Sequence, residues 1–305
     1  MNIAKSLNSI TLVSGALFLT ACTTFANPAA DTRASANRDA ATHTVDFQQI
    51  RNATIKLRYA DTTFLIDPML APKDAYPGFA DTVNSETRYP MVDLPIPIAE
   101  VLKADAIILT HLHDDHWDAA ARNIVPRDMP IFTQNEADAV TVRKDGFTHV
   151  RVLPEQGIVF EGTKISKTIG QHGTDEMYQI PPLAKVLGKT MGLVFEKSNY
   201  KTVYVAGDTI WNKEVEEVLT RYQPDAVILN TGYAKLTSFD DGIIMGKEDV
   251  YRAYQFAPKA QIVSVHMDTV NHATLTKAEL RRFIEEKHLD KQRALVPNDG
   301  QYYKF

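Results

Sequence analysis

Short apolar runs rich in β-branched and aromatic residues recur along most of the chain. Runs of this kind, bounded by polar stretches and turn residues, predict strands. The predicted strands are residues 54–59, 63–66, 106–110, 149–153, 191–195, 202–206, 226–229 and 261–265.

Other segments repeat their apolar residues at the spacing of a helix face. These predicted helices are residues 136–143, 213–222, 247–256 and 277–287. The first strands follow one another without helices, whereas the later ones alternate with helices. This order predicts sheets covered by helices, which is an α/β fold class.

The composition supports a folded protein that does not bind nucleic acid. Of the 305 residues, 44% are hydrophobic, which is ample for a core. The formal net charge of −5 offers no basic surface for a phosphate backbone. We therefore expect no nucleic-acid partner.

The first residues resemble an export signal. Lys5 supplies a positive charge, and the apolar residues 10–19 are too few to span a bilayer. The L-T-A-C sequence of residues 19–22 resembles the lipobox of bacterial lipoproteins. It predicts a signal peptide over residues 1–21 and a lipid anchor at Cys22. Ordinary cleavage after Ala26, which discards Cys22, is the alternative.

The segment that follows predicts a tether. Residues 27–41 are rich in Ala, Asp, Asn, Arg and Thr without apolar periodicity, so we expect a flexible tether over residues 22–43 and a folded domain over residues 44–305. Cys22 is the only cysteine, which excludes an intramolecular disulfide and a cysteine metal ligand. The expected location is the bacterial periplasm, either free or as a membrane-anchored lipoprotein.

The sequence T-H-L-H-D-D-H-W-D, residues 110–118, carries the strongest chemical signal. It directly follows a predicted strand. His111 and His113, two residues apart, can turn toward one point if the backbone stays extended, and Asp115 and His116 follow where the chain bends. Neutral imidazole and carboxylate groups are donors that zinc accepts, as do manganese and iron. We therefore predict a metal site here.

Further ligands must come from elsewhere in the chain. His172 lies in G-Q-H-G, Asp208 ends V-A-G-D, and His266 lies in S-V-H-M. A single residue of this kind is commonly a hydrogen-bonded structural residue. Their shared position at strand ends before a loop favours a common site, because sites of α/β sheets collect there.

Together these motifs resemble the metallo-β-lactamase superfamily. Asp67 in L-I-D-P-M resembles the family aspartate that supports the metal loop without binding metal. The resemblance implies an αββα sandwich of two packed sheets flanked by helices, with the metal site at one edge. By its implication, one metal is held by His111, His113 and His172, a second by Asp115, His116 and His266, and Asp208 bridges them. The T-H-x-H-x-D-H-W-D form and the A-G-D-T turn most resemble the ascorbate-6-phosphate lactonase-like branch.

The resemblance implies a binuclear hydrolase. Two divalent ions, zinc first and manganese or iron as alternatives, lower the pKa of a shared water, so that a metal-bound hydroxide attacks a lactone, ester or amide bond of a small-molecule substrate. Asp115 is also a candidate catalytic residue that passes a proton to the leaving group. A β-lactamase of the cysteine-ligand type is disfavoured, because Asp208 occupies the bridging position.

Other functions stay open at this point. A phosphodiesterase acting on phospholipid or another phosphodiester uses the same metal set, and iron would support redox chemistry. A non-catalytic metal- or ligand-binding lipoprotein is a further alternative. Among the remaining residues, His272 and Tyr233 are candidates to reach the pocket. Residues 173–188 lack an obvious regular pattern and are a candidate substrate lid.

Overall fold

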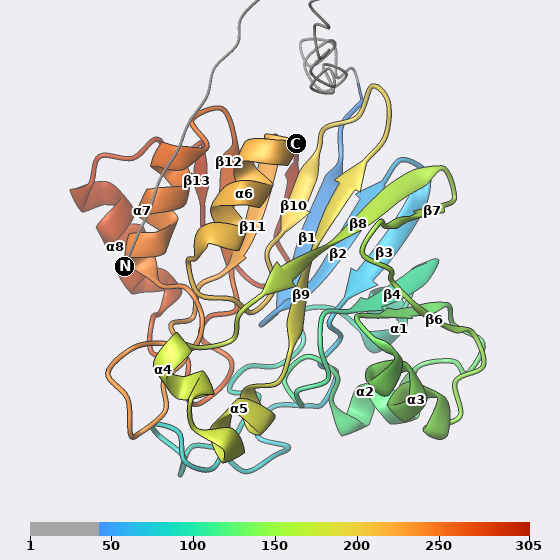
Figure 1. Ribbon diagram of the computed structural model, residues 1–305, viewed down its shortest axis with the longest axis horizontal. Coiled ribbons are helices and arrows are strands. Elements are labelled where there is room, and N and C mark those ends of the chain that lie inside the picture. The colour runs from blue at the N-terminus through green and yellow to red at the C-terminus, as the bar shows by residue number, and fades with distance from the viewer. Residues whose placement is uncertain (1–42) are drawn as a thin grey trace, which may run out of the picture. The chain divides into compact units, whose positions relative to one another are not determined.

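Two seven-stranded sheets pack face to face in a computed structural model that describes residues 43–305 (Figure 1). The first sheet has the order β14-β1-β2-β3-β4-β5-β6, and the second has the order β13-β12-β11-β10-β9-β8-β7. The strands of the first sheet are β1 (Asp46–Arg51), β2 (Thr54–Tyr59), β3 (Thr62–Ile66), β4 (Ala106–Leu109), β5 (Ile131–Thr133), β6 (Val150–Val152) and β14 (Tyr302–Lys304). Those of the second are β7 (Ile158–Phe160), β8 (Thr163–Gly170), β9 (Thr190–Glu196), β10 (Val203–Val205), β11 (Ala226–Asn230), β12 (Gln261–Val265) and β13 (Ala294–Leu295).

The apolar strands are buried on both faces. In β4, Ala106 and Ile108 enter the core between the sheets, whereas Ile107 points to the helices outside the first sheet. In β11, Ile228 faces the inter-sheet core and Val227 faces the opposite way. Successive side chains of a strand point to opposite faces, so a strand covered on both sides must be apolar throughout.

Helices form the outer layers. The first sheet is covered by α1 (Ile98–Val101), α2 (Ala119–Ile124) and α3 (Glu136–Lys144), and the second by α6 (Lys213–Tyr222), α7 (Lys247–Phe256) and α8 (Lys277–Glu286). Helix α6 begins at Lys213 because the Asn212 side chain accepts a hydrogen bond from the Val215 amide. Its buried residues, Val215, Val218 and Leu219, follow the spacing of one helix face. The four layers confirm the predicted αββα sandwich.

The parallel strands place the site. Strands β3 to β6 run parallel to one another, and so do β10 to β13. Parallel strands end together, and polar loops that follow them gather at that edge. The motif residues after β4, β10 and β12 therefore meet at one edge of the sandwich.

Each predicted strand and helix is present, with ends that differ by at most one residue. The expectation of an irregular segment over residues 173–188 was wrong, because it contains α4 (Asp175–Tyr178) and α5 (Pro181–Leu187). Thr174 caps α4, and α5 begins with prolines at positions where no helical amide hydrogen is needed. Strand β1 escaped prediction because Gln48 and Gln49 are buried and interrupt its apolar pattern.

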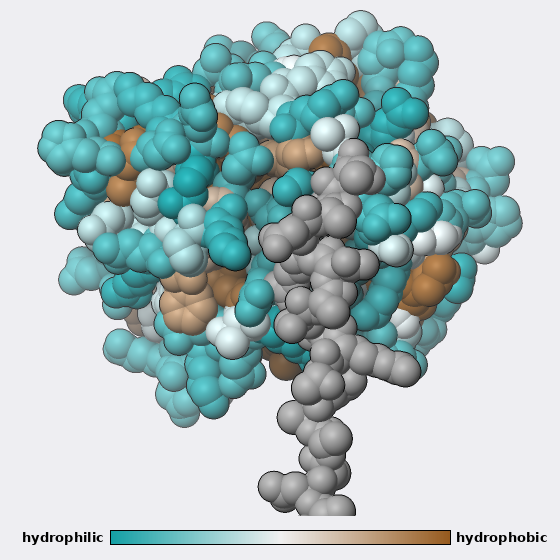
Figure 2. Space-filling model, turned by 90° about the horizontal axis from the view of Figure 1, so that it is seen from above, coloured by the Kyte–Doolittle hydropathy of each residue, from teal (hydrophilic) through white to brown (hydrophobic). Residues whose placement is uncertain are grey.

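The predicted signal peptide, lipobox and most of the tether lie outside the described residues. His43, at the tether's end, forms a β-bridge with Tyr200 and stacks on its ring. Between residues 43 and 305, no helix has the length and apolar character to cross a membrane. The face shown in Figure 2 is mostly hydrophilic with separate small hydrophobic areas, as is usual for a protein surface in water.

Candidate metal centre

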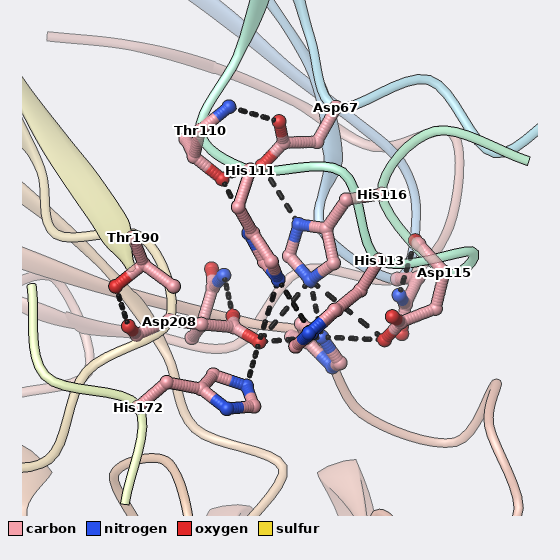
Figure 3. Close-up of polar contacts among 12 residues, drawn as sticks. Asp67, Thr110, His111, His113, Asp115, His116, His172, Thr190 and Asp208 are labelled. Carbon is pink, nitrogen blue, oxygen red and sulfur yellow. Dashed lines mark hydrogen bonds and ion pairs between the residues drawn. The ribbon is translucent and has the colours of Figure 1, made fainter. Parts of the chain in front are cut away.

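Histidine and aspartate side chains converge at the edge where the parallel strands end (Figure 3). They form three groups, in each of which the possible ligand atoms lie within 4.8 Å of one another. The groups are His111 with His113 and His172, His111 with His116 and Asp208, and Asp115 with His116 and His266. The fold thus brings together all seven residues that the sequence predicted as ligands.

Local backbone geometry carries these side chains into the site. The V-A-G-D turn after β10 needs Gly207, which has a φ of 68°. A Cβ at this position would lie 2.5 Å from the Met191 carbonyl oxygen. Only glycine therefore lets Asp208 leave the strand at this angle.

Asp67 holds the loop of residues 110–118 in place and belongs to none of the three groups. Its carboxylate accepts hydrogen bonds from the Thr110 amide at 2.7 Å, the Thr110 hydroxyl at 2.6 Å and His116 Nδ1 at 2.8 Å. Because the Thr110 hydroxyl proton is used on Asp67, Thr110 Oγ1 accepts from His111 Nδ1 at 3.1 Å. Both histidines therefore turn Nε2 toward the centre of the site.

His113 is oriented by a contact with α5. Its Nε2 donates to the Val186 carbonyl of α5 at 2.8 Å, so its Nδ1 is left unprotonated. That Nδ1 lies 3.0 Å from His111 Nε2, which is also unprotonated. Two lone pairs facing each other repel unless a cation lies between them. Nitrogens bound to one tetrahedral zinc at about 2.0–2.1 Å are about 3.3 Å apart, so this pair fits a shared metal.

Asp208 lies at the centre of the cluster. Its Oδ2 is 2.9 Å from His172 Nε2, 3.2 Å from His116 Nε2 and 3.7 Å from His266 Nε2. Its other oxygen, Oδ1, accepts a hydrogen bond of 2.6 Å from Asn230 Nδ2. Asn230 thereby fixes the carboxylate so that one oxygen faces both proposed metal positions.

The charges of the cluster are strongly coupled. Burial opposes ionisation of Asp208, but the neighbouring His116 and His266 hold its pKa well below the usual value. Burial also disfavours the charged form of His116, yet Asp208 and Asp115 raise the pKa of His116 well above the usual value. A divalent ion bound here would replace the His116 proton between the same carboxylates, and its uptake would release a proton.

Asn52, which the sequence analysis missed, connects two predicted ligands from different sheets. It lies in the turn between β1 and β2 with a left-handed φ of 55°. Its Nδ2 donates to the Asp115 carbonyl at 3.0 Å, and its own carbonyl accepts from the His266 amide at 3.0 Å. Asn52 therefore sets the spacing of the Asp115–His116–His266 group.

We expect Asn52→Gly to weaken metal binding at that group. Glycine keeps the left-handed backbone, so the loss is confined to the side-chain hydrogen bond and its volume. The dissociation constant of the more weakly held metal should rise about tenfold, as is usual when an outer support of a ligand is removed. Competition with a chromogenic chelator measures this value. Asn84→Gly is the matched control, because Asn84 has a φ of 52° and bonds the Asn271 carbonyl instead. Equal metal affinities in both variants would contradict the assignment.

Asn230 and Thr190 also escaped the sequence analysis. Asn230 is the last residue of β11, and the predicted ligands also lie at or just after strand ends. Its position was therefore a usable sequence signal for a residue of the site. Thr190 Oγ1 donates to the Asp208 carbonyl at 2.6 Å. Nothing in the sequence near Thr190 indicates this contact, which depends on the pairing of β9 with β10.

Tyr233 does not join the cluster. It lines a separate cavity of about 890 Å³ with Trp211, Phe283 and other residues, and none of the seven predicted ligands lines that cavity. Tyr233, a candidate to reach the pocket, therefore lies outside the metal site.

Comparison with known proteins identifies related sequences. A family model described as "Beta-lactamase superfamily domain" matches residues 62–267. The UPF0173 protein YddR of Bacillus subtilis (strain 168) is 44% identical over 262 residues, covering 86% of this chain and 100% of that protein. A UPF0173 metal-dependent hydrolase of Thermoplasma acidophilum is 25% identical over 191 residues, covering 61% of this chain and 76% of that protein.

Two solved structures are similar over most of the chain. The crystal structure of a possible metal-dependent hydrolase from Veillonella parvula DSM 2008 has 45% identity and a TM-score of 0.84. That of isothiocyanate hydrolase from Delia radicum gut bacteria has 47% identity and a TM-score of 0.82. Each match covers 86% of this chain and 99% of the other.

Proposed function

The chain belongs to the metallo-β-lactamase superfamily, and from that premise we propose that it is a hydrolase with two divalent metal ions that acts on an electrophilic carbon of a small molecule. The observation that carries this proposal is the pair of facing nitrogens, His111 Nε2 and His113 Nδ1, 3.0 Å apart, whose other ring nitrogens are engaged elsewhere. Such an arrangement suits a cation.

The proposed ligand sets follow the three groups. His111, His113 and His172 would hold one ion, Asp115, His116 and His266 would hold the other, and Asp208 would contact both. Zinc fits this donor set, as manganese and iron do. When bound, the ions supply hydroxide near neutral pH and polarise the oxygen or sulfur of the attacked group.

Asp115 has two proposed roles. Its Oδ2 lies 3.2 Å from His266 Nε2 and 3.7 Å from His116 Nε2, which suits a ligand. Burial opposes its ionisation, but His116 and His266 hold the pKa of Asp115 well below the usual value. As an anion it accepts a proton from the attacking water, and because it holds that proton weakly it passes it on to the leaving group.

Isothiocyanates are the first substrate class to test. The 47% identical relative is described as an isothiocyanate hydrolase, and the central carbon of R–N=C=S accepts a nucleophile as a carbonyl carbon does. Water adds to that carbon, the carbon–nitrogen bond breaks, and the products are the amine R–NH₂ and carbonyl sulfide. Lactones, esters and amides present the same kind of carbon and form the second class.

A substrate panel tests the proposal. The purified, metal-loaded protein is assayed with benzyl isothiocyanate, a lactone, a nitrophenyl ester, a nitrophenyl phosphodiester and a chromogenic β-lactam. We expect amine release from the isothiocyanate that stops on chelation and returns with zinc. Turnover of the phosphodiester alone would replace this proposal by the phosphodiesterase alternative. Bound metal without any turnover would favour a binding lipoprotein.

Export and lipid anchoring are part of the proposal and rest on the sequence of residues 1–43. We expect metabolic labelling with a palmitate analogue to mark the wild type and not Cys22→Ala, because L-T-A-C follows a short apolar segment. In-gel fluorescence after labelling measures this. A soluble, unlabelled wild type that begins at Asn27 would show ordinary cleavage instead.

A further inference from the structure

His272 is a buried histidine beside the cluster that the proposed metal ligands leave unused. It lies six residues after His266, is 6% exposed and belongs to none of the three ligand groups. Burial lowers the pKa of His272 to about 4, and the charges that act on its ring are those of Asp115, His266, His172 and Asp208. The ring is therefore close to the cluster and uncharged at neutral pH. Dications bound to the cluster would lower the pKa of His272 further.

The tautomer of His272 follows from its surroundings. Within residues 43–305, Nδ1 is enclosed and has no hydrogen-bond partner. Nε2 is not among the enclosed atoms and also makes no hydrogen bond to a described residue. Burying an N–H group without a hydrogen-bond partner costs more free energy than burying an unpaired nitrogen lone pair. The proton of the neutral ring therefore resides on Nε2. His272 thus offers one N–H donor that no described residue uses.

Two loops hold this ring in place before any ligand binds. The Phe79 ring packs edge-on against His272, with centroids 4.8 Å apart and planes at 70°, and it stacks on Tyr89 with centroids 4.4 Å apart. Asn271 Oδ1 accepts from the Phe79 amide at 3.0 Å, and Asn271 Nδ2 donates to Thr82 Oγ1 at 2.8 Å. The Nε2–H group of His272 is therefore held in a fixed position beside the rings of Phe79 and Tyr89 before a ligand binds.

We propose that His272 is a substrate-contacting residue whose Nε2–H donates a hydrogen bond to the atom of an uncharged substrate on which negative charge develops during attack, with Phe79 forming the apolar side of this subsite. This inference rests on the proposed hydrolase function. An uncharged donor strengthens as charge grows on its acceptor but adds no positive field for a charged substrate. The subsite therefore favours isothiocyanates and esters over phosphodiesters.

The test compares His272→Leu, which removes the donor, with His272→Gln, whose amide NH₂ can occupy the place of Nε2–H. His149→Leu is the matched control, because His149 is exposed and bonds the Asp128 carbonyl. The full-length, metal-loaded proteins are titrated with N-benzylthiourea, an uncharged probe that resists hydrolysis. Metal content, melting temperature and kcat/KM are measured on the same samples.

We expect His272→Leu to keep its metal and melting temperature but to bind the probe at least about tenfold more weakly, and His272→Gln to recover most of this loss. Where the protein turns over an isothiocyanate or ester, kcat/KM should follow the same order. Equal probe binding by the leucine variant, no probe binding by the wild type, or metal loss in both variants would overturn the inference. Wild-type probe binding that depends on His272, without turnover of any panel substrate, would refute the proposed function and leave the subsite standing.

Discussion

Replacing Asp208 by asparagine is expected to remove about one metal ion per chain while the fold is preserved. Two dications about 3.5–4 Å apart repel each other strongly, and shared anions between them make the arrangement stable. Asp208 Oδ2 is the carboxylate oxygen that faces His172, His116 and His266. In the variant, Asn230 Nδ2 would retain the amide oxygen as its acceptor and thereby turn the new NH₂ group toward these histidines. The variant would thus present a donor where a metal needs an anion.

Metal stoichiometry by mass spectrometry beside a melting curve measures this result. We also expect turnover at neutral pH to drop on the order of a hundredfold or more, since a water near one ion is less acidic than a water shared by two. Asp225→Asn is the control, because the Asp225 carboxylate accepts a hydrogen bond from the Thr202 amide and belongs to none of the three ligand groups. An Asp208→Asn protein that keeps two ions and a lower melting temperature would assign Asp208 a purely structural role.

Asp67→Asn should damage the site as severely, although Asp67 belongs to none of the ligand groups. Asn accepts the left-handed φ of 47° found here, so the backbone is preserved. The oxygen that receives protons from the Thr110 hydroxyl and His116 Nδ1 would become an NH₂ group. His116 would then have to present Nδ1 as an acceptor, which moves its proton to Nε2. A protonated Nε2 cannot bind a metal.

We expect metal affinity in Asp67→Asn to fall by about 10- to 100-fold. Chelator competition measures the affinity, and the imidazole ¹⁵N chemical shifts of the zinc-loaded protein report which nitrogen of His116 is protonated. Asp225→Asn serves again as the control. If the variant binds metal as tightly as the wild type with an unprotonated Nε2, Asp67 does not set the tautomer.

The sequence indicates the buried strands well because nearly all of their side chains are apolar. A strand such as β4, covered on both faces, has no place for a polar residue, and this leaves a plain apolar run. Strand β8 was missed because Lys164 and Lys167 interrupt the apolar run. The short helices α4 and α5 were missed because a few residues carry little periodicity.

The candidate ligands were predictable for a different reason. Histidine and aspartate at strand ends are rare enough to notice, and parallel strands end together. Asn52 could not be found in this way, because its role consists of hydrogen bonds to residues far away in the chain. Asn52 reaches Asp115, 63 residues further along. Such contacts depend on which loops the fold places side by side.

Both proposed ligand groups draw side chains from both sheets. His111 and His113 follow β4 of the first sheet, and His172 follows β8 of the second; Asp115 and His116 likewise meet His266, which follows β12. A metal held by either group is therefore a reversible crosslink between the two halves of the sandwich, in a chain that cannot form an internal disulfide. A free metal concentration a thousandfold above the dissociation constant adds about 4 kcal/mol to the free energy of unfolding. The metal supply would then determine how strongly the two sheets are held together at this edge of the protein.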